Sequence, residues 1–212
     1  MISDKKWFEM NLNPGNNISN FGFELPSLPP DEVQKAFTGI SGKKNIEQAF
    51  AFYKFILKNC ISKKQPTIMD FGSGWGRITR LFLRDTLAEN IFAVDPYSVA
   101  LDWMYNTKLP CRIIKSNPLP PIPEIGIKKF DLIYAFSVFS HLSEEYFNSW
   151  MFYLLSLLDE QGTIIFTTRG MHFINYIEKN EINKNIFKNY EDIKIKYNSG
   201  QFQFFGHKRS DE

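Results

Sequence analysis

Glycine occupies every second position in a short stretch that follows a run of apolar residues. The segment from Ile68 to Phe82 reads IMDFGSGWGRITRLF, and an aspartate, Asp70, stands two residues before the first of three glycines. Glycine lowers the stability of a strand or helix interior by roughly 0.5 to 1 kcal/mol relative to alanine. Three glycines at one junction therefore indicate a backbone that a ligand approaches closely.

The spacing of these glycines disfavours two common phosphate-binding turns. With Gly72 and Gly74 as the first two glycines of the dinucleotide fingerprint GxGxxG, the third position falls on Arg77, which has a large side chain. A P-loop needs a lysine directly after its last glycine, and no lysine follows Gly76. The turn therefore favours a ligand other than a dinucleotide or a nucleoside triphosphate.

Polar residues also follow the next apolar stretches along the chain. They are Asp95 and Pro96 after IFAV, Asn117 after CRIIK, and Ser137 and His141 after FDLIYAF. A carboxylate at the end of a second strand can accept hydrogen bonds from both hydroxyls of a ribose, which nicotinamide enzymes also exploit. Asp95 therefore supports an adenosine-containing cofactor without choosing between enzyme families.

His141 is the candidate general base, because a neutral imidazole accepts a proton near neutral pH. The same histidine equally fits a structural role, since Ser143 begins a predicted helix two residues later. Arg169 fits either a contact with an anionic substrate group or a surface salt bridge. His172 and Tyr134 are weaker candidates for the site.

Short apolar stretches alternate with segments of helical period over most of the chain, which predicts a parallel sheet. Strands are expected at TIMDF, NIFAVD, CRIIKS, FDLIYAFS and TIIFTTR, and helices over 45–60, 77–90, 98–107 and 143–162, the last stopped by Gly162. Right-handed crossovers then give an α/β fold with a doubly wound, mostly parallel Rossmann-like sheet and helices on both faces. Ligands bind such sheets at the carboxyl ends of the strands.

The two ends of the chain have weaker patterns. Residues 1–44 are rich in Asn, Pro and Gly and are expected to form an extension or lid with one short helix over 31–37. Residues 45–212 form the predicted cofactor-binding domain. After about residue 171 the pattern fits a truncated chain as well as a complete domain, and EDIKIKYN and QFQFFGH are the candidate final strands.

Composition excludes several classes of protein. The 25 Lys and Arg against 23 Asp and Glu give a net charge of +2 without a basic arm, so no nucleic-acid partner is expected. Cys60 and Cys111 lie far apart without metal-ligand spacing, which predicts reduced thiols and no metal site. No apolar run approaches the roughly 20 residues of a membrane span or has the form of a signal peptide, so we expect a cytoplasmic protein.

The segment DFGSGWG resembles the S-adenosylmethionine-binding motif of class I methyltransferases, and the likeness extends over roughly residues 45–170. The resemblance implies S-adenosylmethionine as cofactor and a role for Asp70 in binding the amino end of its methionine. It implies that the cofactor lies against the backbone of Gly72, Ser73, Gly74 and Gly76.

The likeness also assigns roles beyond the glycine turn. It implies that Asp95, with Pro96 beside it, binds the ribose hydroxyls, and that Asn117, or Ser116 next to it, contacts the adenine amino group, where many family members carry aspartate. FDLIYAFSVFSHLSEEYFNSW resembles the fourth strand and following helix of methyltransferases that act on small molecules, which implies that Ser137 borders the methyl-donor pocket. A looser likeness links FELPSLPPDEVQKAFTGISG and SVFSHL to bacterial methyltransferases of surface-polysaccharide biosynthesis.

These observations predict methylation of a small molecule or glycan precursor at oxygen. The fourth strand ends in YAFS and lacks the Asn/Asp-Pro-Pro-aromatic motif of nucleic-acid amino-methyltransferases, which argues against a DNA substrate. Two alternatives stay open, an NAD-dependent oxidoreductase and a cofactor-binding scaffold domain without activity.

Overall fold

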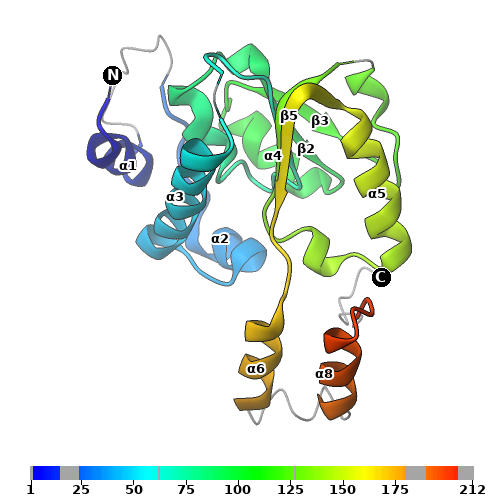
Figure 1. The fold of residues 1–212 in the computed structure, drawn as a ribbon. Coiled ribbons are helices and arrows are strands. Elements are labelled where there is room, and N and C mark those ends of the chain that lie inside the picture. Colours follow the sequence, from blue (N-terminus) through cyan, green and yellow to red (C-terminus); the bar gives the residue numbers. More distant parts are fainter. Residues whose placement is uncertain (1, 15–23, 62, 127, 180–189, 205–212) are drawn as a thin grey trace.

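The sheet at the centre of the fold is entirely parallel. The computed structural model describes residues 2–14, 24–61, 63–126, 128–179 and 190–204 (Figure 1). The strands are β1 (Ile68–Phe71), β2 (Ile91–Asp95), β3 (Arg112–Lys115), β4 (Phe130–Ala135) and β5 (Leu158–Phe166), in the spatial order β3-β2-β1-β4-β5. The chain therefore crosses over after β3 to place β4 beside β1, which confirms the predicted doubly wound sheet.

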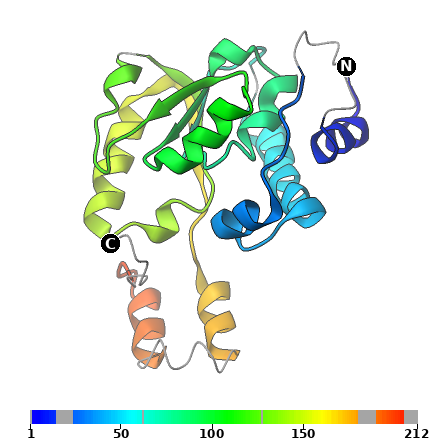
Figure 2. The same cartoon turned by 180° about the vertical axis from the view of Figure 1, so that it is seen from behind.

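Each face of the sheet has its own apolar cluster, because successive side chains of a strand point to opposite faces. Ile68 and Leu132 pack with α3 (Gly42–Asn59) and α4 (Ser98–Asn106). Met69 and Ile133 pack with α5 (Glu144–Ser156) on the other face. Figures 1 and 2 show α3 and α5 on opposite sides of the sheet. Helices on both faces are therefore confirmed.

The N-terminal segment contains a helix that the sequence pattern did not predict, α1 (Asp4–Leu12). Trp7 on this helix is fully buried in the cluster under α3, and its indole Nε1 donates a hydrogen bond to the carbonyl of Leu81 over 2.9 Å. The predicted short helix is present as α2 (Asp31–Thr38). The segment before α3 thus contributes to the core as well as to the surface.

The segment after the glycine turn winds differently from the prediction. An α-helix was expected over 77–90, and the structure has two 3₁₀ helices there, at Thr79–Arg84 and Ala88–Asn90, joined by a turn. Thr79 and the four residues after it are buried or nearly so, whereas Leu87, expected on the buried face, is 52% exposed. Contacts on all sides of this segment therefore override its local helical period.

The end of α5 was also predicted too late. The helix ends at Ser156, and Gly162 lies inside β5 rather than at a helix stop. Residues 159–162 form an irregularity in the pairing of β5 with β4. A Cβ on Gly162 would lie 2.6 Å from the carbonyl oxygen of Phe130, so glycine permits a close approach of two strands here.

The predicted C-terminal strands are wrong where the structure describes them. EDIKIKYN lies in a helix, α8 (Tyr190–Asn198), which contacts α6 (Met171–Lys179). Ile193 is 8% exposed and Ile195 is 65% exposed, although a strand would place both on one face. Residues 201–204 of QFQFFGH have no regular structure, and its last three residues lie outside the described part. Figure 1 shows α6 and α8 as a pair beyond the carboxyl end of β5.

No helix in the described ranges is long and apolar enough to cross a membrane.

Candidate cofactor site

Hydrogen bonds join the glycine turn to the carboxyl end of the neighbouring strand, β2. The backbone amides of Gly72 and Ser73 donate to the carbonyl of Val94 in β2, over 2.8 and 3.1 Å. The amide of Gly74 donates to the Oδ2 atom of Asp95 over 2.8 Å. The turn and the second acidic residue of the sequence prediction therefore form one unit.

Two of the three glycines meet protein on the side where a Cβ would stand. Gly72 and Gly76 have φ angles of 76° and 81°, in the left-handed region that side chains disfavour. A Cβ on Gly72 would collide with the side chain of Val138, and one on Gly76 would lie 2.5 Å from Leu109 and 2.9 Å from Met104. These two glycines therefore allow the turn to pack closely against neighbouring side chains of the protein.

Gly74 differs because its Cβ position is open. Its φ is 55°, and among the described residues the one neighbour within 4 Å of a Cβ there is the Cδ1 atom of Phe37, at 3.8 Å. Phe37 belongs to α2 and is 37% exposed. No side chain therefore separates the backbone at Gly74 from a space that α2 borders. This arrangement is expected of a surface against which a ligand lies.

Asp70 lies beneath the turn and is 2% exposed. The hydroxyl of Thr79 donates to its Oδ2 atom over 2.5 Å. The hydroxyl of Tyr134 lies close enough to lower the carboxyl's pKa, although the pair lacks regular hydrogen-bond geometry. Burial outweighs these contacts and raises the pKa of Asp70 to about 7, with a smaller contribution from the charge of Asp95.

Asp95 ends β2 and is 5% exposed. Its two carboxylate oxygens accept from the backbone amides of Gly74 and Tyr97, over 2.8 and 2.9 Å. Burial raises its pKa, and these two amides oppose the shift. A carboxylate has about four lone-pair sites, so Asp95 can hold the turn and still accept from a ligand hydroxyl. Pro96, directly after it, is exposed.

Four buried polar atoms of the described residues have no hydrogen-bond partner. They are Ser73 Oγ, Trp75 Nε1, Ser116 Oγ and the Tyr134 hydroxyl. Ser73 and Trp75 belong to the turn, and the amide of Ser116 donates to the carbonyl of Asp95 over 3.1 Å. Buried polar groups are usually satisfied, and a polar ligand is one way to satisfy them. The residues present thus fit an adenosine-containing cofactor.

Ser116 and Asn117, the two candidates for the adenine contact, differ in burial. Asn117 is exposed, whereas Ser116 is 3% exposed and its hydroxyl is unpartnered among the described residues. Ser116 therefore has the stronger structural case for contacting a buried ligand.

The candidate catalytic residues lie on the exit loop of β4. Ser137 has a φ of 63°, and its amide donates to the Thr167 hydroxyl over 2.7 Å, which joins this loop to the exit of β5. The Oγ atom of Ser137 and the Nε2 atom of His141 lie 3.5 Å apart. Both residues are exposed at the same edge of the sheet as the turn.

The other weak candidates lie further along the chain. Arg169 is exposed and stacks on the ring of Phe173, with 4.3 Å between its guanidinium carbon and the ring centroid. His172 is exposed on α6.

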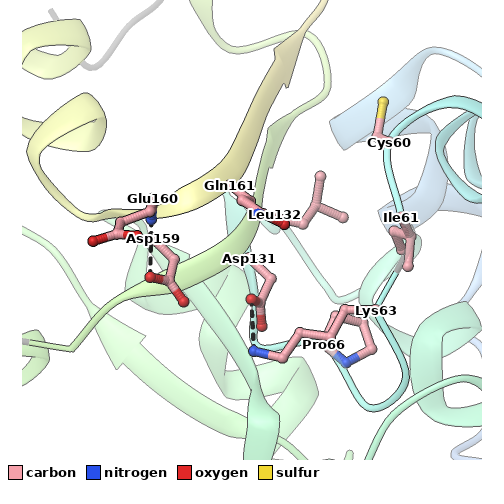
Figure 3. Close-up of a pocket in the computed structure, with 9 residues that line it drawn as sticks. All are labelled: Cys60, Ile61, Lys63, Pro66, Asp131, Leu132, Asp159, Glu160 and Gln161. Carbon is pink, nitrogen blue, oxygen red and sulfur yellow. Dashed lines mark hydrogen bonds and ion pairs between the residues drawn. The ribbon is translucent and has the colours of Figure 1, made fainter.

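A pocket of about 300 Å³ lies at the opposite, amino edge of the sheet (Figure 3). Lys63 and Asp131 form an ion pair of 2.8 Å within it, and Cys60 lines one side. The strands present their amino ends here, so this pocket is distant from the turn and does not contribute to it. No cluster of metal-ligating side chains occurs in the part of the chain that the structure describes.

The fold is that of solved S-adenosylmethionine-dependent methyltransferases. No family model and no curated protein matches the sequence. Solved structures do match, among them an S-adenosylmethionine-dependent methyltransferase of Clostridium acetobutylicum, with a TM-score of 0.50, 16% identity, and coverage of 69% of this chain and 58% of that one. The chain thus spans less than two thirds of that protein.

Two further structures support the same fold. The plantazolicin methyltransferase BpumL, solved in complex with a monoazolic desmethylPZN analog and SAH, has a TM-score of 0.51 and 15% identity, and the match covers 69% of this chain and 56% of that one. The methyltransferase domain of bacterial CtHen1-C has a TM-score of 0.51 and 15% identity, with coverage of 74% and 84%. At these identities the likeness establishes the fold.

Sequence reasoning missed two buried polar residues next to the turn. Thr79 hydrogen-bonds Asp70, and Arg77, noted in the sequence only because it is not glycine, is 6% exposed beside the turn. A buried polar residue within a predicted amphipathic segment is the signal that points to Thr79. The partners of Arg77 lie in α3, too far away in sequence for a local pattern to reveal them.

Proposed function

We propose that this chain binds S-adenosylmethionine at the glycine turn and transfers its methyl group to an oxygen of a small molecule or glycan precursor. The observation that carries the proposal is the bare backbone at Gly74, in a turn that follows the buried Asp70 and donates a hydrogen bond to the buried Asp95. The unpartnered buried hydroxyls beside it and the methyltransferase fold support the same assignment.

Residues in and around the turn bind different parts of the cofactor. Asp70, beneath the turn, attracts the ammonium of the methionine part, because a carboxylate complements a cation. Asp95 accepts from the ribose hydroxyls while it holds the amide of Gly74. Ser116, with Asn117 beside it, accepts from the adenine amino group. The cofactor supplies an electrophilic methyl on a sulfonium, and the protein's contribution is to hold donor and acceptor in line.

His141 is the proposed base for a hydroxyl acceptor. A neutral imidazole takes the acceptor's proton as the oxygen attacks, and general bases contribute about 10²- to 10⁴-fold to rate. The contact between His141 and Ser137 orients the imidazole on the loop that borders the methyl-donor pocket. A hydroxyl needs this help more than an amine does, because a hydroxyl loses its proton less readily.

Calorimetric titration of the full chain with S-adenosylmethionine, S-adenosylhomocysteine and NAD tests the cofactor. We expect binding of the first two and none of NAD. Binding of NAD without S-adenosylmethionine would instead establish the oxidoreductase alternative. Product formation from labelled cofactor is then measured with sugars, nucleotide-linked sugars and phenols, and cofactor binding without turnover on any of them favours the scaffold alternative.

A His141→Gln variant tests the base, and His172→Gln tests the weaker of the two exposed histidine candidates in the same assay. We expect kcat to fall about 10²- to 10⁴-fold in the first variant with the Kd for cofactor unchanged, and no change in the second. Wild-type turnover by His141→Gln would leave the histidine a structural role only.

A further inference from the structure

The outer side of β5 is an uncovered edge of the sheet. β5 is the last strand in the order β3-β2-β1-β4-β5, so among the described residues no strand pairs with its outer side. Figure 1 views the sheet from this edge, with α3 and α5 on either side of β5 and with α6 and α8 beyond its carboxyl end. Residues 163–166 are only half-buried, whereas every residue of β1 and β2 is buried. The edge is therefore open to a partner.

The opposite edge of the sheet is protected by charge, and the β5 edge is not. β3 has four residues and carries an exposed cation at each end, Arg112 and Lys115. Charged side chains, lysine above all, prevent an edge strand from pairing with another chain. Residues 163–168 of the β5 edge read TIIFTT, without a charge or a proline. This composition favours strand pairing, so we expect the β5 edge to be covered in solution.

Alternation along β5 decides which backbone groups point outward. The amide of Thr167 donates to the carbonyl of Ala135 in β4 over 3.1 Å. Ile165 has the same orientation, because every second residue of a strand directs its amide and carbonyl to the same side. Ile164 and Phe166 therefore direct theirs away from β4. An added antiparallel strand would form its hydrogen bonds with these two residues.

The residues around Ile165 match in type when the strand is read in either direction. Thr163 and Thr167 stand two residues to either side of it, and Ile164 and Phe166 one residue to either side. When two copies pair antiparallel with Ile165 opposite itself, Thr lies opposite Thr and Ile opposite Phe. Thr–Thr and aromatic–β-branched pairs are favourable cross-strand contacts. In this register Ile164 and Phe166 of opposite copies form the hydrogen-bonded pair, which agrees with the direction of their amides.

Charges near the two ends of the strand complement each other in the same register. Asp159 and Glu160 precede the regular part of β5, Arg169 follows it, and all three are exposed. Antiparallel pairing brings the acidic end of one copy to the Arg169 end of the other, which favours association. A parallel arrangement would instead bring like charges together.

Exposed apolar side chains flank the edge on both faces of the sheet. Phe55 on α3 is 54% exposed and lies one turn after Phe52, whose ring packs against β4. Leu155 on α5 is 50% exposed and lies on the side of that helix opposite Tyr153, whose hydroxyl contacts Ile122 in the loop after β3. A second copy that extended the sheet would thus approach an apolar side chain on each face.

We propose that two copies of this chain pair through their β5 edges, antiparallel about a two-fold axis at Ile165, and form one continuous sheet. Such an interface uses the same patch on both copies, so it closes at the dimer and leaves the charged β3 edges at the two ends. Because the paired strands run in opposite directions, the two glycine turns lie at opposite edges of the combined sheet. The inference is independent of the proposed function.

Sedimentation equilibrium of the full chain, from nanomolar to high micromolar concentration, measures the assembly. We expect a dimer of the 24.8 kDa chain. Ile164→Pro removes an amide that points outward and keeps the ladder with β4, so the dimer Kd should rise at least about 10-fold. Ile164→Val is the matched control that keeps the amide, and it should stay dimeric. Thermal melting reports whether each variant folds.

Cysteine cross-linking tests the register in a background that carries Cys60→Ser and Cys111→Ser. Ile165→Cys places two thiols in a directly opposed pair whose Cα atoms lie about 4.5 Å apart, within the range of a disulfide. Ile164→Cys is the control, because its two copies are diagonal neighbours about 7 to 8 Å apart, which is too far. We expect oxidised glutathione to cross-link the first variant and not the second.

Several results would overturn the inference. A monomer at every concentration would do so, and the edge would then be left to a different partner. A folded Ile164→Pro variant that dimerises like the wild type would place the interface elsewhere, and assemblies larger than a dimer would contradict closure. Cross-linking through Ile164→Cys instead of Ile165→Cys would refute the register. If Ile164→Pro does not fold, the cross-linking decides. Failure to bind S-adenosylmethionine would leave the dimer untouched.

Discussion

Substituting alanine at Gly74 or at Gly76 separates ligand binding from folding at the glycine turn. Both residues have left-handed φ angles, 55° and 81°, which disfavour alanine by about 1 to 2 kcal/mol. A Cβ at Gly74 meets only Phe37 among the described residues, at an ordinary contact distance of 3.8 Å, whereas a Cβ at Gly76 meets Leu109 and Met104 at 2.5 and 2.9 Å. Overpacking adds about 1 to 3 kcal/mol, so Gly76→Ala should lower the free energy of unfolding by about 2 to 5 kcal/mol.

Thermal melting measures these losses. For a domain of this size each kcal/mol lowers Tm by about 2 to 4 °C, so we expect a fall of about 2 to 8 °C for Gly74→Ala and about 4 to 20 °C for Gly76→Ala. Calorimetric titration with S-adenosylmethionine should show the opposite order. Gly74→Ala should weaken binding by at least about 10-fold, or 1.4 kcal/mol, because its methyl group occupies the surface where the cofactor lies.

Binding of the cofactor by Gly74→Ala with wild-type affinity would refute this reasoning. The cofactor would then not lie against the backbone at Gly74. Equal loss of affinity in the two variants, measured at a temperature where both are folded, would also refute it, because it would mean that alanine acts only by distorting the turn.

Three further perturbations test the rest of the site and the fold. Asp70 has a pKa of about 7 without ligand, and a nearby ammonium favours its ionised form. Affinity for S-adenosylmethionine, measured by calorimetry, should therefore rise as the pH increases from about 6 to 7.5, and Asp70→Asn should abolish that rise. An equal rise in the variant would contradict a contact between Asp70 and the ammonium. Ser116→Ala should weaken cofactor binding more than Asn117→Ala, measured by calorimetry, because only Ser116 is buried; the reverse order would assign the adenine contact to Asn117. Trp7→Ala should destabilise the fold by about 3 to 5 kcal/mol in denaturant titrations, and a loss below about 1 kcal/mol would show that α1 is a peripheral extension.

The sheet could be predicted because its strands are buried on both faces. All residues of β1 and β2 are buried, so each strand stands out as a continuous apolar run between more polar segments. The glycine turn and Asp95 could be located for the same reason, because each directly follows such a run. Sequence position then implied spatial proximity, and the hydrogen bond from Gly74 to Asp95 confirms it.

Elements governed by distant contacts could not be predicted in this way. Trp7 is buried against Leu81, and nothing local to residues 4–12 signals that contact. The alternation of Ile and Lys in IKIK suggested a strand, yet Ile195 is 65% exposed on a helix. For the site, Arg77 is fixed by Asn45 and Gln48, which precede it by 32 and 29 residues. Such pairings exist only in the folded chain.

The charges at the turn link the stability of the free protein to its affinity for ligand. Burial raises the pKa of Asp70 to about 7, so between about pH 4 and pH 7 the folded state holds a proton that the unfolded state has lost. Stability therefore falls as the pH rises through that window, and above it the full unfavourable energy of the buried carboxylate is present. The charge of Arg77 offsets part of this energy, because it lowers the pKa of Asp70.

An ammonium of the ligand beside Asp70 would relieve this unfavourable energy, because a nearby cation favours the ionised form of a buried carboxyl group. It follows that saturating S-adenosylmethionine should raise Tm by more at pH 7.5, where Asp70 is largely ionised, than at pH 6, and that this difference should disappear in Asp70→Asn. The same Tm increase at both pH values in the wild type would mean that the ligand's ammonium does not reach Asp70.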